Sequence, residues 1–239
     1  MYGYRARIGY TSPPAATEVV PYEFYMIVPK GITLVLHTLA IVEMNKEEID
    51  RSYEMSLRAA RDLALAGVNL VVLGGVPINL SRGFDNVNAL ISDTEAKIGV
   101  PVTTSITAQI DALQNVGARH IAVGHPFSPQ HDQMFLDYID HYGFERAGTK
   151  GADRTAVELG QIPTDTALAL GHALKRENPQ ADTLWLPCPH WAVAEAIDPL
   201  EKELGMTVVT ALQAIVWHAL RRCGVDDRIE GFGRLFREF

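Results

Sequence analysis

The sequence predicts an α/β fold made of two pseudo-symmetric, Rossmann-like lobes, each with a parallel sheet, and an active site in the cleft between them. Two observations lead to this prediction. Short apolar segments typical of buried strands alternate with helical segments along all 239 residues, which is the pattern of parallel sheets covered by helices. The order of elements and turns in the first half also recurs in the second half, which indicates an internal repeat.

The first half contains four predicted strands. Each is a nearly continuous run of apolar or β-branched residues, as expected for strands buried on both faces; they cover residues 8–12, 32–40, 68–73 and 100–104. Asn45, with Glu48 three residues later, predicts the start of a helix that ends before Gly67. Thr17 is the expected N-cap of an earlier helix. The other predicted helices cover residues 86–98 and 105–116.

The second half repeats this alternation. Its predicted strands cover residues 121–124, 144–148, 183–186 and 207–209. Its predicted helices cover residues 130–142, 164–177, 192–204 and 211–223. The carboxyl-terminal segment 231–239 contains phenylalanine and arginine, and we expect it to pack back on the body of the protein, with the first lobe as one candidate surface.

The two halves can be aligned segment by segment. Residues 99–105 correspond to 205–211, and residues 71–77 correspond to the stretch from Trp185 onward. Gly75 then falls opposite Cys188. We therefore predict one lobe over residues 1–117 and another over 118–239, with the substrate bound between the turns that carry Gly75 and Cys188.

Composition limits the classes of partner. The formal net charge is −8, with 47% hydrophobic and 21% charged residues, which argues against nucleic acid or an anionic membrane surface as a partner. There are only two cysteines, Cys188 and Cys223, so a reducing compartment is expected. Neither a signal peptide nor a membrane span is recognisable. We expect a cytoplasmic enzyme with a small carboxylate substrate; the sequence leaves the oligomeric state open.

Cys188 is the main candidate for a reacting group. It ends the apolar segment 184–187 and lies between Pro187 and Pro189, which fix φ and exclude a helix interior at this position. Open α/β sheets place reacting groups at the carboxyl ends of their strands. The alternative interpretation is a buried, inert thiol.

Three other polar groups follow predicted strands. Ser12 lies in a small, polar strand-to-helix turn that suits anion binding, although an ordinary connection would have the same composition. His125 and His190 follow corresponding strands of the two lobes. No paired ligand spacing accompanies them, so a hydrogen-bonding, proton-relay or packing role is expected and a metal is not.

Paired lobes with facing turns, one of which carries a cysteine, resemble the aspartate/glutamate racemase superfamily. This superfamily includes amino-acid and hydantoin racemases, maleate cis-trans isomerases and arylmalonate decarboxylases. Its two-cysteine members use one thiol from each lobe, whereas this chain has Gly75 in the place of the first. The single cysteine resembles the arylmalonate decarboxylases. This likeness covers nearly the whole chain, and its most specific short match is the segment 231–236.

The resemblance implies a cofactor-independent decarboxylase of a malonate-like diacid, aryl-substituted diacids included. Hydrogen-bond donors would hold one carboxylate, and the leaving carboxylate would sit in an apolar pocket. Cys188 would then protonate the enediolate on one face. Trp185, Trp191 and Pro14 are the expected apolar walls, which would keep the thiol protonated.

The chain departs from the family pattern where the retained carboxylate is held. In the family, three kinds of group hold this carboxylate. They are hydroxyl side chains after the facing glycine, a tyrosine in the second lobe's first turn, and backbone N–H groups after the cysteine. The corresponding positions are Val76, Pro77, Phe127 and Pro189, and the candidate replacements are Thr11, Ser12, Thr17, His125 and His190. Two alternatives therefore stay open. One is a racemase or maleate isomerase-like cis-trans isomerase, and the other is a ligand-binding protein on an inactive scaffold.

Overall fold

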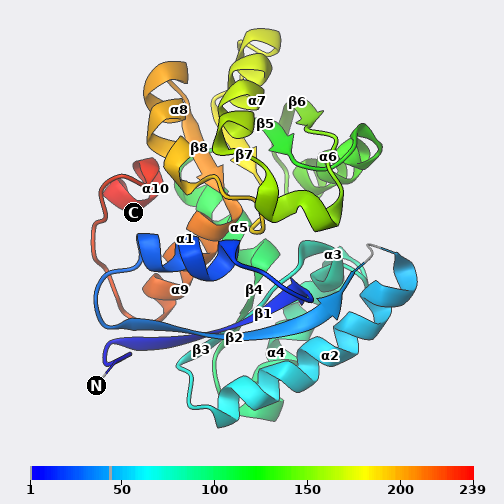
Figure 1. Ribbon diagram of the computed structural model, residues 1–239, viewed down its shortest axis with the longest axis vertical. Helices are drawn as coiled ribbons and strands as arrows, with labels where there is room; N and C mark the ends of the chain where they lie inside the picture. Colours follow the sequence, from blue (N-terminus) through cyan, green and yellow to red (C-terminus); the bar gives the residue numbers. More distant parts are fainter. Residues whose placement is uncertain (1, 43–44) are drawn as a thin grey trace.

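The strands form two parallel sheets with the same topology. The computed structural model describes residues 2–42 and 45–239. Within these residues, one sheet has the strand order β2-β1-β3-β4 and the other β6-β5-β7-β8, and every neighbouring pair is parallel. The first sheet lies in the lower half of Figure 1 and the second in the upper half. The predicted fold class is confirmed.

The elements follow the predicted order. The first half of the chain forms β1 (Ala6–Pro14), α1 (Val19–Ile27), β2 (Ile32–Ile41), α2 (Lys46–Leu65), β3 (Leu70–Leu73), α3 (Val76–Asn79), α4 (Val87–Ile98), β4 (Val102–Thr104) and α5 (Ser105–Asn115). The second half forms β5 (His120–His125), α6 (Asp132–His141), β6 (Glu145–Gly151), α7 (Thr164–Glu177), β7 (Thr183–Leu186), α8 (Ile197–Leu204), β8 (Thr207–Thr210), α9 (Ala211–Arg222) and α10 (Gly233–Glu238).

Most local predictions hold, with two corrections. The Asn45 side chain accepts a hydrogen bond from the Glu48 N–H, so the predicted cap of α2 is confirmed. Thr17 is not a cap, because Glu18 occupies the N-cap position of α1. The helix predicted over 192–204 is shorter, since α8 begins only at Ile197 after a 3-10 turn.

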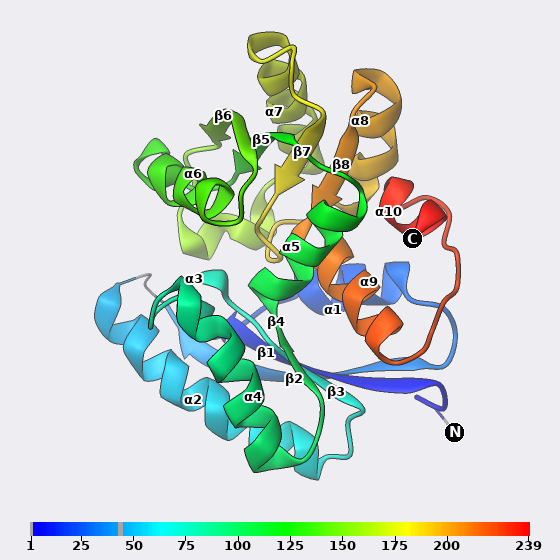
Figure 2. The ribbon, with the colours of Figure 1, turned by 180° about the vertical axis from the view of Figure 1, so that it is seen from behind.

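A shared core joins the two lobes. Helix α5 from the first half lies against α9 from the second, between the two sheets (Figure 2). Helix α9 also contacts β3 and α1, while α5 contacts β8. Trp185 of β7 is buried in this core and donates its indole N–H to Gln109 Oε1 on α5 at 3.0 Å. This packing fixes the strand ends of one lobe relative to those of the other.

The carboxyl-terminal helix packs mainly on second-half elements. Helix α10 contacts α8, β8 and α9, and the Gly233 N–H donates to Asp198 Oδ1 at 2.8 Å. One contact to the end of the first half is also present, from Arg234 Nη1 to the Val116 carbonyl at 2.9 Å. The boundary at residue 117 stays a prediction.

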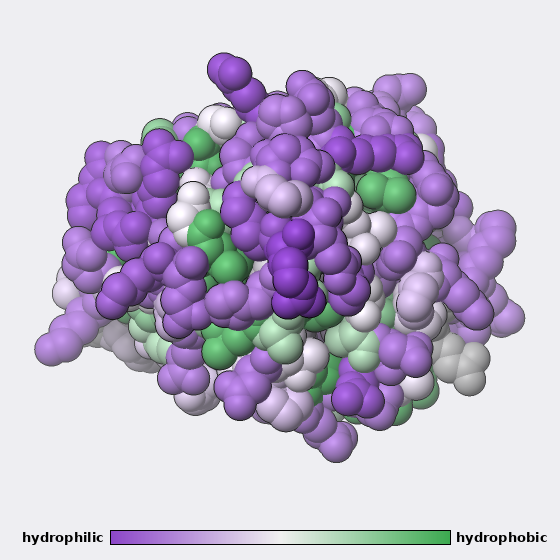
Figure 3. All heavy atoms as spheres, turned by 90° about the horizontal axis from the view of Figure 1, so that it is seen from above, coloured by the Kyte–Doolittle hydropathy of each residue, from purple (hydrophilic) through white to green (hydrophobic). Residues whose placement is uncertain are grey.

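The surface seen from the top of the molecule is mainly hydrophilic, with small hydrophobic areas among polar side chains (Figure 3). Among the described residues, no helix combines the length and the apolar character needed to cross a bilayer.

Candidate active site

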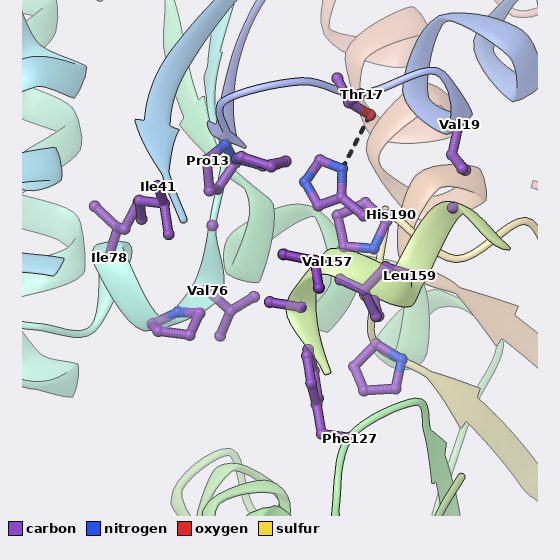
Figure 4. A pocket seen from close by; sticks show the side chains of 18 of the residues that line it. Pro13, Thr17, Val19, Ile41, Val76, Ile78, Phe127, Val157, Leu159 and His190 are labelled. Carbon is purple, nitrogen blue, oxygen red and sulfur yellow. Dashed lines mark hydrogen bonds between the residues drawn. The ribbon is translucent and has the colours of Figure 1, made fainter. Parts of the chain in front are cut away.

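A cavity of about 500 Å³ lies where the strand ends of the two lobes meet. The first lobe contributes the turns after β1 and β3, and the second contributes the turns after β5 and β7 together with α6 and the 3-10 segment Ala156–Gln161. Figure 4 shows Pro13, Val76, Phe127, Val157 and Leu159 around this space. Parallel α/β sheets bind ligands at this end of their strands, so the cavity is the candidate active site.

Cys188 lies in the cavity wall and is only 6% exposed. Burial raises the pKa of its thiol to about 12, and the nearby Glu23 carboxyl acts in the same direction. Hydrogen bonds from the backbone N–H groups of His190 and Trp191 to the sulfur oppose this rise in pKa. Cys188 is therefore a protonated thiol at neutral pH, with two donors ready to hold the thiolate that remains after proton transfer.

Gly75 lies in the facing wall of the cavity, on the turn between β3 and α3. Its φ is +87°, and a Cβ atom built on it would lie 2.6 Å from Pro13 Cγ. Gly74 is equally restricted, because a Cβ atom there would lie 2.0 Å from the Thr11 carbonyl oxygen. The turn therefore brings bare backbone to the position that corresponds to Cys188.

The side chain of His190 is neutral and connects its own lobe to the other through Thr17. Its exposed fraction is 8%, and burial lowers the pKa of the imidazole to about 4. Nδ1 lies 3.3 Å from Thr17 Oγ1 in the turn after β1, whereas Nε2 has no hydrogen-bond partner among the described residues. Figure 4 shows this second nitrogen turned toward the space between Pro13 and Val76.

Glu23 connects α1 to the segment that follows Cys188. Its side chain is 2% exposed, and Oε1 accepts the N–H groups of Val193 at 2.6 Å and Ala194 at 2.7 Å. Burial raises the pKa of Glu23 to about 7, against these two hydrogen bonds, which lower it. A carboxyl group of the first lobe thus accepts hydrogen bonds from two backbone N–H groups of the second lobe, close to the thiol.

The structure separates the predicted site residues into two groups. The cavity lining includes Pro14, Gly75, Val76, Pro77, Phe127, Cys188, Pro189 and His190. Ser12 and His125 are fully buried and lie outside this lining. His125 Nε2 is 2.7 Å from Asp132 Oδ1, and its ring stacks on Phe135. Within the described part of the chain, no cluster of three or more potential metal ligands forms.

The expected tryptophan walls are confirmed only in part. Neither tryptophan belongs to the cavity lining. Trp191 is buried in the same hydrophobic cluster as Cys188 and contributes to the apolar surroundings of the thiol, whereas Trp185 belongs to the core shared by the two lobes. The apolar walls instead come from residues that the sequence did not single out: Val19, Ile41, Met134, Phe135, Tyr138, Val157 and Leu159. The amphipathic pattern of α6 was the available signal for three of them, but it could not distinguish a cavity wall from ordinary core.

Comparisons with known proteins agree with this geometry. A family model described as arylmalonate decarboxylase matches residues 8–236. Arylmalonate decarboxylase of Bordetella bronchiseptica is 27% identical over 233 residues, covering 97% of this chain and 96% of that one. Maleate isomerase of Geobacillus stearothermophilus is 22% identical over 203 residues, covering 82% and 80%.

A solved structure of a liganded arylmalonate decarboxylase double mutant superposes with a TM-score of 0.90 at 26% identity, covering 98% of this chain and 100% of that one. Its fold is the two-sheet α/β architecture described above. The relatives are enzymes, decarboxylases or isomerases of one superfamily. The chain belongs to the arylmalonate decarboxylase family, within the aspartate/glutamate racemase superfamily.

Proposed function

We propose that this chain is a cofactor-independent decarboxylase of malonate-like diacids with an apolar 2-substituent, aryl groups included. The observation that carries the proposal is the pair of facing turns, one with the buried thiol of Cys188 and one with Gly75. A protonated thiol on one side only suits a reaction that delivers one proton to one face of a planar intermediate.

The reaction breaks the bond between the α-carbon and the leaving carboxylate, which departs as CO2. The electron pair of that bond passes into the retained carboxyl group and forms an enediolate. Cys188 then transfers its S–H proton to the α-carbon. The thiolate that remains accepts the N–H groups of His190 and Trp191, and water restores its proton. Cys188 is thus the general acid of the proposed reaction.

The cavity walls support an apolar substituent and an apolar site for the leaving group. Val76, Phe127, Phe135, Val157 and Leu159 contribute hydrocarbon surface on several sides. Such surroundings destabilise the charge of a carboxylate more than they destabilise neutral CO2. A volume of about 500 Å³ also accommodates a substituted malonate.

Racemisation or isomerisation is the second candidate, favoured by the maleate isomerase relatives. In this superfamily these reactions use a second cysteine on the opposite face, as an acid–base group or as a nucleophile. The position opposite Cys188 is Gly75 here. A thiol in one lobe alone therefore supports decarboxylation better.

The test is incubation in D2O with 2-methyl-2-phenylmalonate, with related 2-substituted malonates, and with chiral 2-arylpropionates and maleate. We expect CO2 release and a single product enantiomer with one deuterium at the α-carbon, and both are lost in Cys188→Ala. Deuterium exchange, inversion or isomerisation without CO2 would refute decarboxylation and support the second candidate. Cys223→Ala is the control, since Cys223 is only partly buried and lies at the end of α9 outside the cavity lining.

A further inference from the structure

The side chain of His190 has a hydrogen-bonding group that the reaction described above does not use. It is more than nine-tenths buried, and its Nε2 atom lacks a partner among the described residues while Nδ1 is engaged by Thr17. A buried polar atom without a partner is costly, and such atoms often mark a ligand site. Nε2 points away from Thr17, toward the side of the cavity where Pro13 and Val76 lie (Figure 4), so a bound molecule is the candidate for the missing partner.

The bond to Thr17 decides what Nε2 can do. A neutral imidazole has one N–H and one lone pair, and burial keeps His190 neutral at physiological pH. If the Thr17 hydroxyl donates to Nδ1, the ring proton lies on Nε2 and faces the cavity. The opposite arrangement would present a lone pair to an anionic substrate and repel it. A carboxylate in the cavity therefore favours the tautomer with the proton on Nε2.

We propose that His190 donates its Nε2–H to the retained carboxyl group of the substrate, and that Thr17 is the positioning residue that holds this tautomer. The inference deepens the proposed function and rests on it for the identity of the carboxyl group. It supplies a donor where Val76 and Phe127 have no hydroxyl and Pro77 and Pro189 have no N–H.

This arrangement places two functions on one turn. Cys188 and His190 are two residues apart, so the proton donor and the carboxyl anchor share the segment after β7. Thr17 approaches from the turn between β1 and α1 in the other lobe. The anchor is therefore complete only when the two lobes are in their present relative position.

Binding of an unreactive carboxylate tests the anchor. Phenylacetate is titrated into the wild type, His190→Gln and His190→Asn by calorimetry, with ethylbenzene as a probe that lacks the carboxyl group. Glutamine places an amide N–H near the position of Nε2, whereas asparagine reaches only the position of Nδ1. We expect His190→Asn to lose phenylacetate affinity by about ten- to a hundredfold, the usual effect of a donor to a charged group. His190→Gln should lose much less, and ethylbenzene affinity should change little in either.

Nitrogen NMR of the histidine rings tests the tautomer without turnover. The His190 signals are assigned by their loss in His190→Gln. We expect a proton on Nε2 in the wild type and in Thr17→Ser, and a mixture of tautomers in Thr17→Val, which lacks the hydroxyl. A proton on Nδ1 in the wild type with phenylacetate bound would overturn the proposal. Equal phenylacetate affinity in the wild type and His190→Asn would also overturn it.

These measurements separate the two proposals. CO2 release with unchanged phenylacetate binding in His190→Asn leaves the decarboxylase standing and removes the anchor. Isomerisation without CO2, accompanied by the expected tautomer and loss of affinity, removes the decarboxylase and keeps His190 as the carboxylate donor.

Discussion

The turn after β3 and the turn after β7 occupy corresponding places in the two lobes, but different interactions hold them. In the first turn Gly75 takes a positive φ and the chain enters α3 at once, where the Asn79 N–H donates to the Gly75 carbonyl at 2.9 Å. In the cysteine turn, residues 187–193, two prolines flank Cys188 and the chain turns at Pro189 and His190. Glu23 from the other lobe accepts the Val193 and Ala194 N–H groups.

The difference shows how two lobes of the same architecture can provide a proton donor on only one side of the substrate. In the first turn the positive φ of Gly75 and its closeness to Pro13 leave no room for a side chain, so the position that corresponds to Cys188 has none. The cysteine turn keeps a side chain and fixes its position by prolines and by a contact across the lobes. Pseudo-symmetry of the sheets therefore does not extend to the reacting groups.

Removal of the thiol has the largest expected effect. Cys188→Ala removes the thiol that donates the proton. We therefore expect the rate of CO2 release to fall by about 10²- to 10⁴-fold, the range contributed by a positioned general acid. The measurement is a progress curve of CO2 release at saturating substrate. Cys223→Ala should keep the wild-type rate. A Cys188→Ala rate within a few fold of the wild type would mean that the asymmetry of the turns is unrelated to proton delivery.

Glu23→Gln tests the contact that holds the cysteine turn. Burial raises the pKa of Glu23 from 4.5 to about 7, so the folded state binds this proton more tightly than the unfolded chain does. The resulting stabilisation is complete below about pH 4.5 and is lost as the pH rises through about 7. Relative to Glu23→Gln, we expect the wild-type free energy of unfolding to fall by about 2–3 kcal/mol over this interval.

Urea denaturation at a series of pH values measures this difference. The comparison variant is Glu195→Gln, which removes an exposed carboxyl group whose charge makes the smallest contribution to the raised pKa of Glu23, and it should reduce the pH dependence only slightly. Parallel pH curves for the wild type and Glu23→Gln would show that folding leaves the pKa of Glu23 at its ordinary value.

Gly75→Ala tests the first turn. The substitution places a Cβ atom 2.6 Å from Pro13 Cγ at a φ of +87°, and strain of this kind costs about 1–3 kcal/mol. We expect this loss in urea denaturation, together with weaker substrate binding because Pro13 also lines the cavity. Gly67→Ala is the matched control, since its φ is +75° but no described atom lies within 4 Å of the new Cβ. A loss no larger than in Gly67→Ala would show that Pro13 moves aside freely.

Sequence patterns predict the sheets well because most strands are nearly continuous apolar or β-branched runs between turn residues, although β6 contains charged residues and glycines. The same patterns could not show that β7 ends before the cavity, since β7 is buried along its whole length. The sequence alone therefore does not distinguish a Trp185 that packs in the shared core from one that lies against the thiol. Thr17 and His190 are separated by 173 positions, and Glu23 looks like an ordinary charged helix residue. Their roles depend on lobe packing, which local patterns do not record.

Pro189→Ala has the smallest expected effect on stability and gives the sharpest comparison of the two turns. Loss of a proline that fits its native geometry increases the entropy of the unfolded chain and costs about 0.4–1 kcal/mol. Pro77→Ala in the first turn should cost a similar amount, so urea denaturation alone will not separate the two variants.

The enantiomeric ratio of 2-phenylpropionate formed from 2-methyl-2-phenylmalonate should separate them. Pro189 adjoins the sulfur-bearing residue, so its loss widens the range of positions from which the S–H proton is delivered, and the minor enantiomer increases. Pro77 adjoins Val76 and Ile78, which have no proton to donate, and its loss should leave the ratio unchanged. A greater loss of selectivity in Pro77→Ala would show that the first turn fixes the face of the intermediate by placing the substrate, while the cysteine turn only supplies the proton.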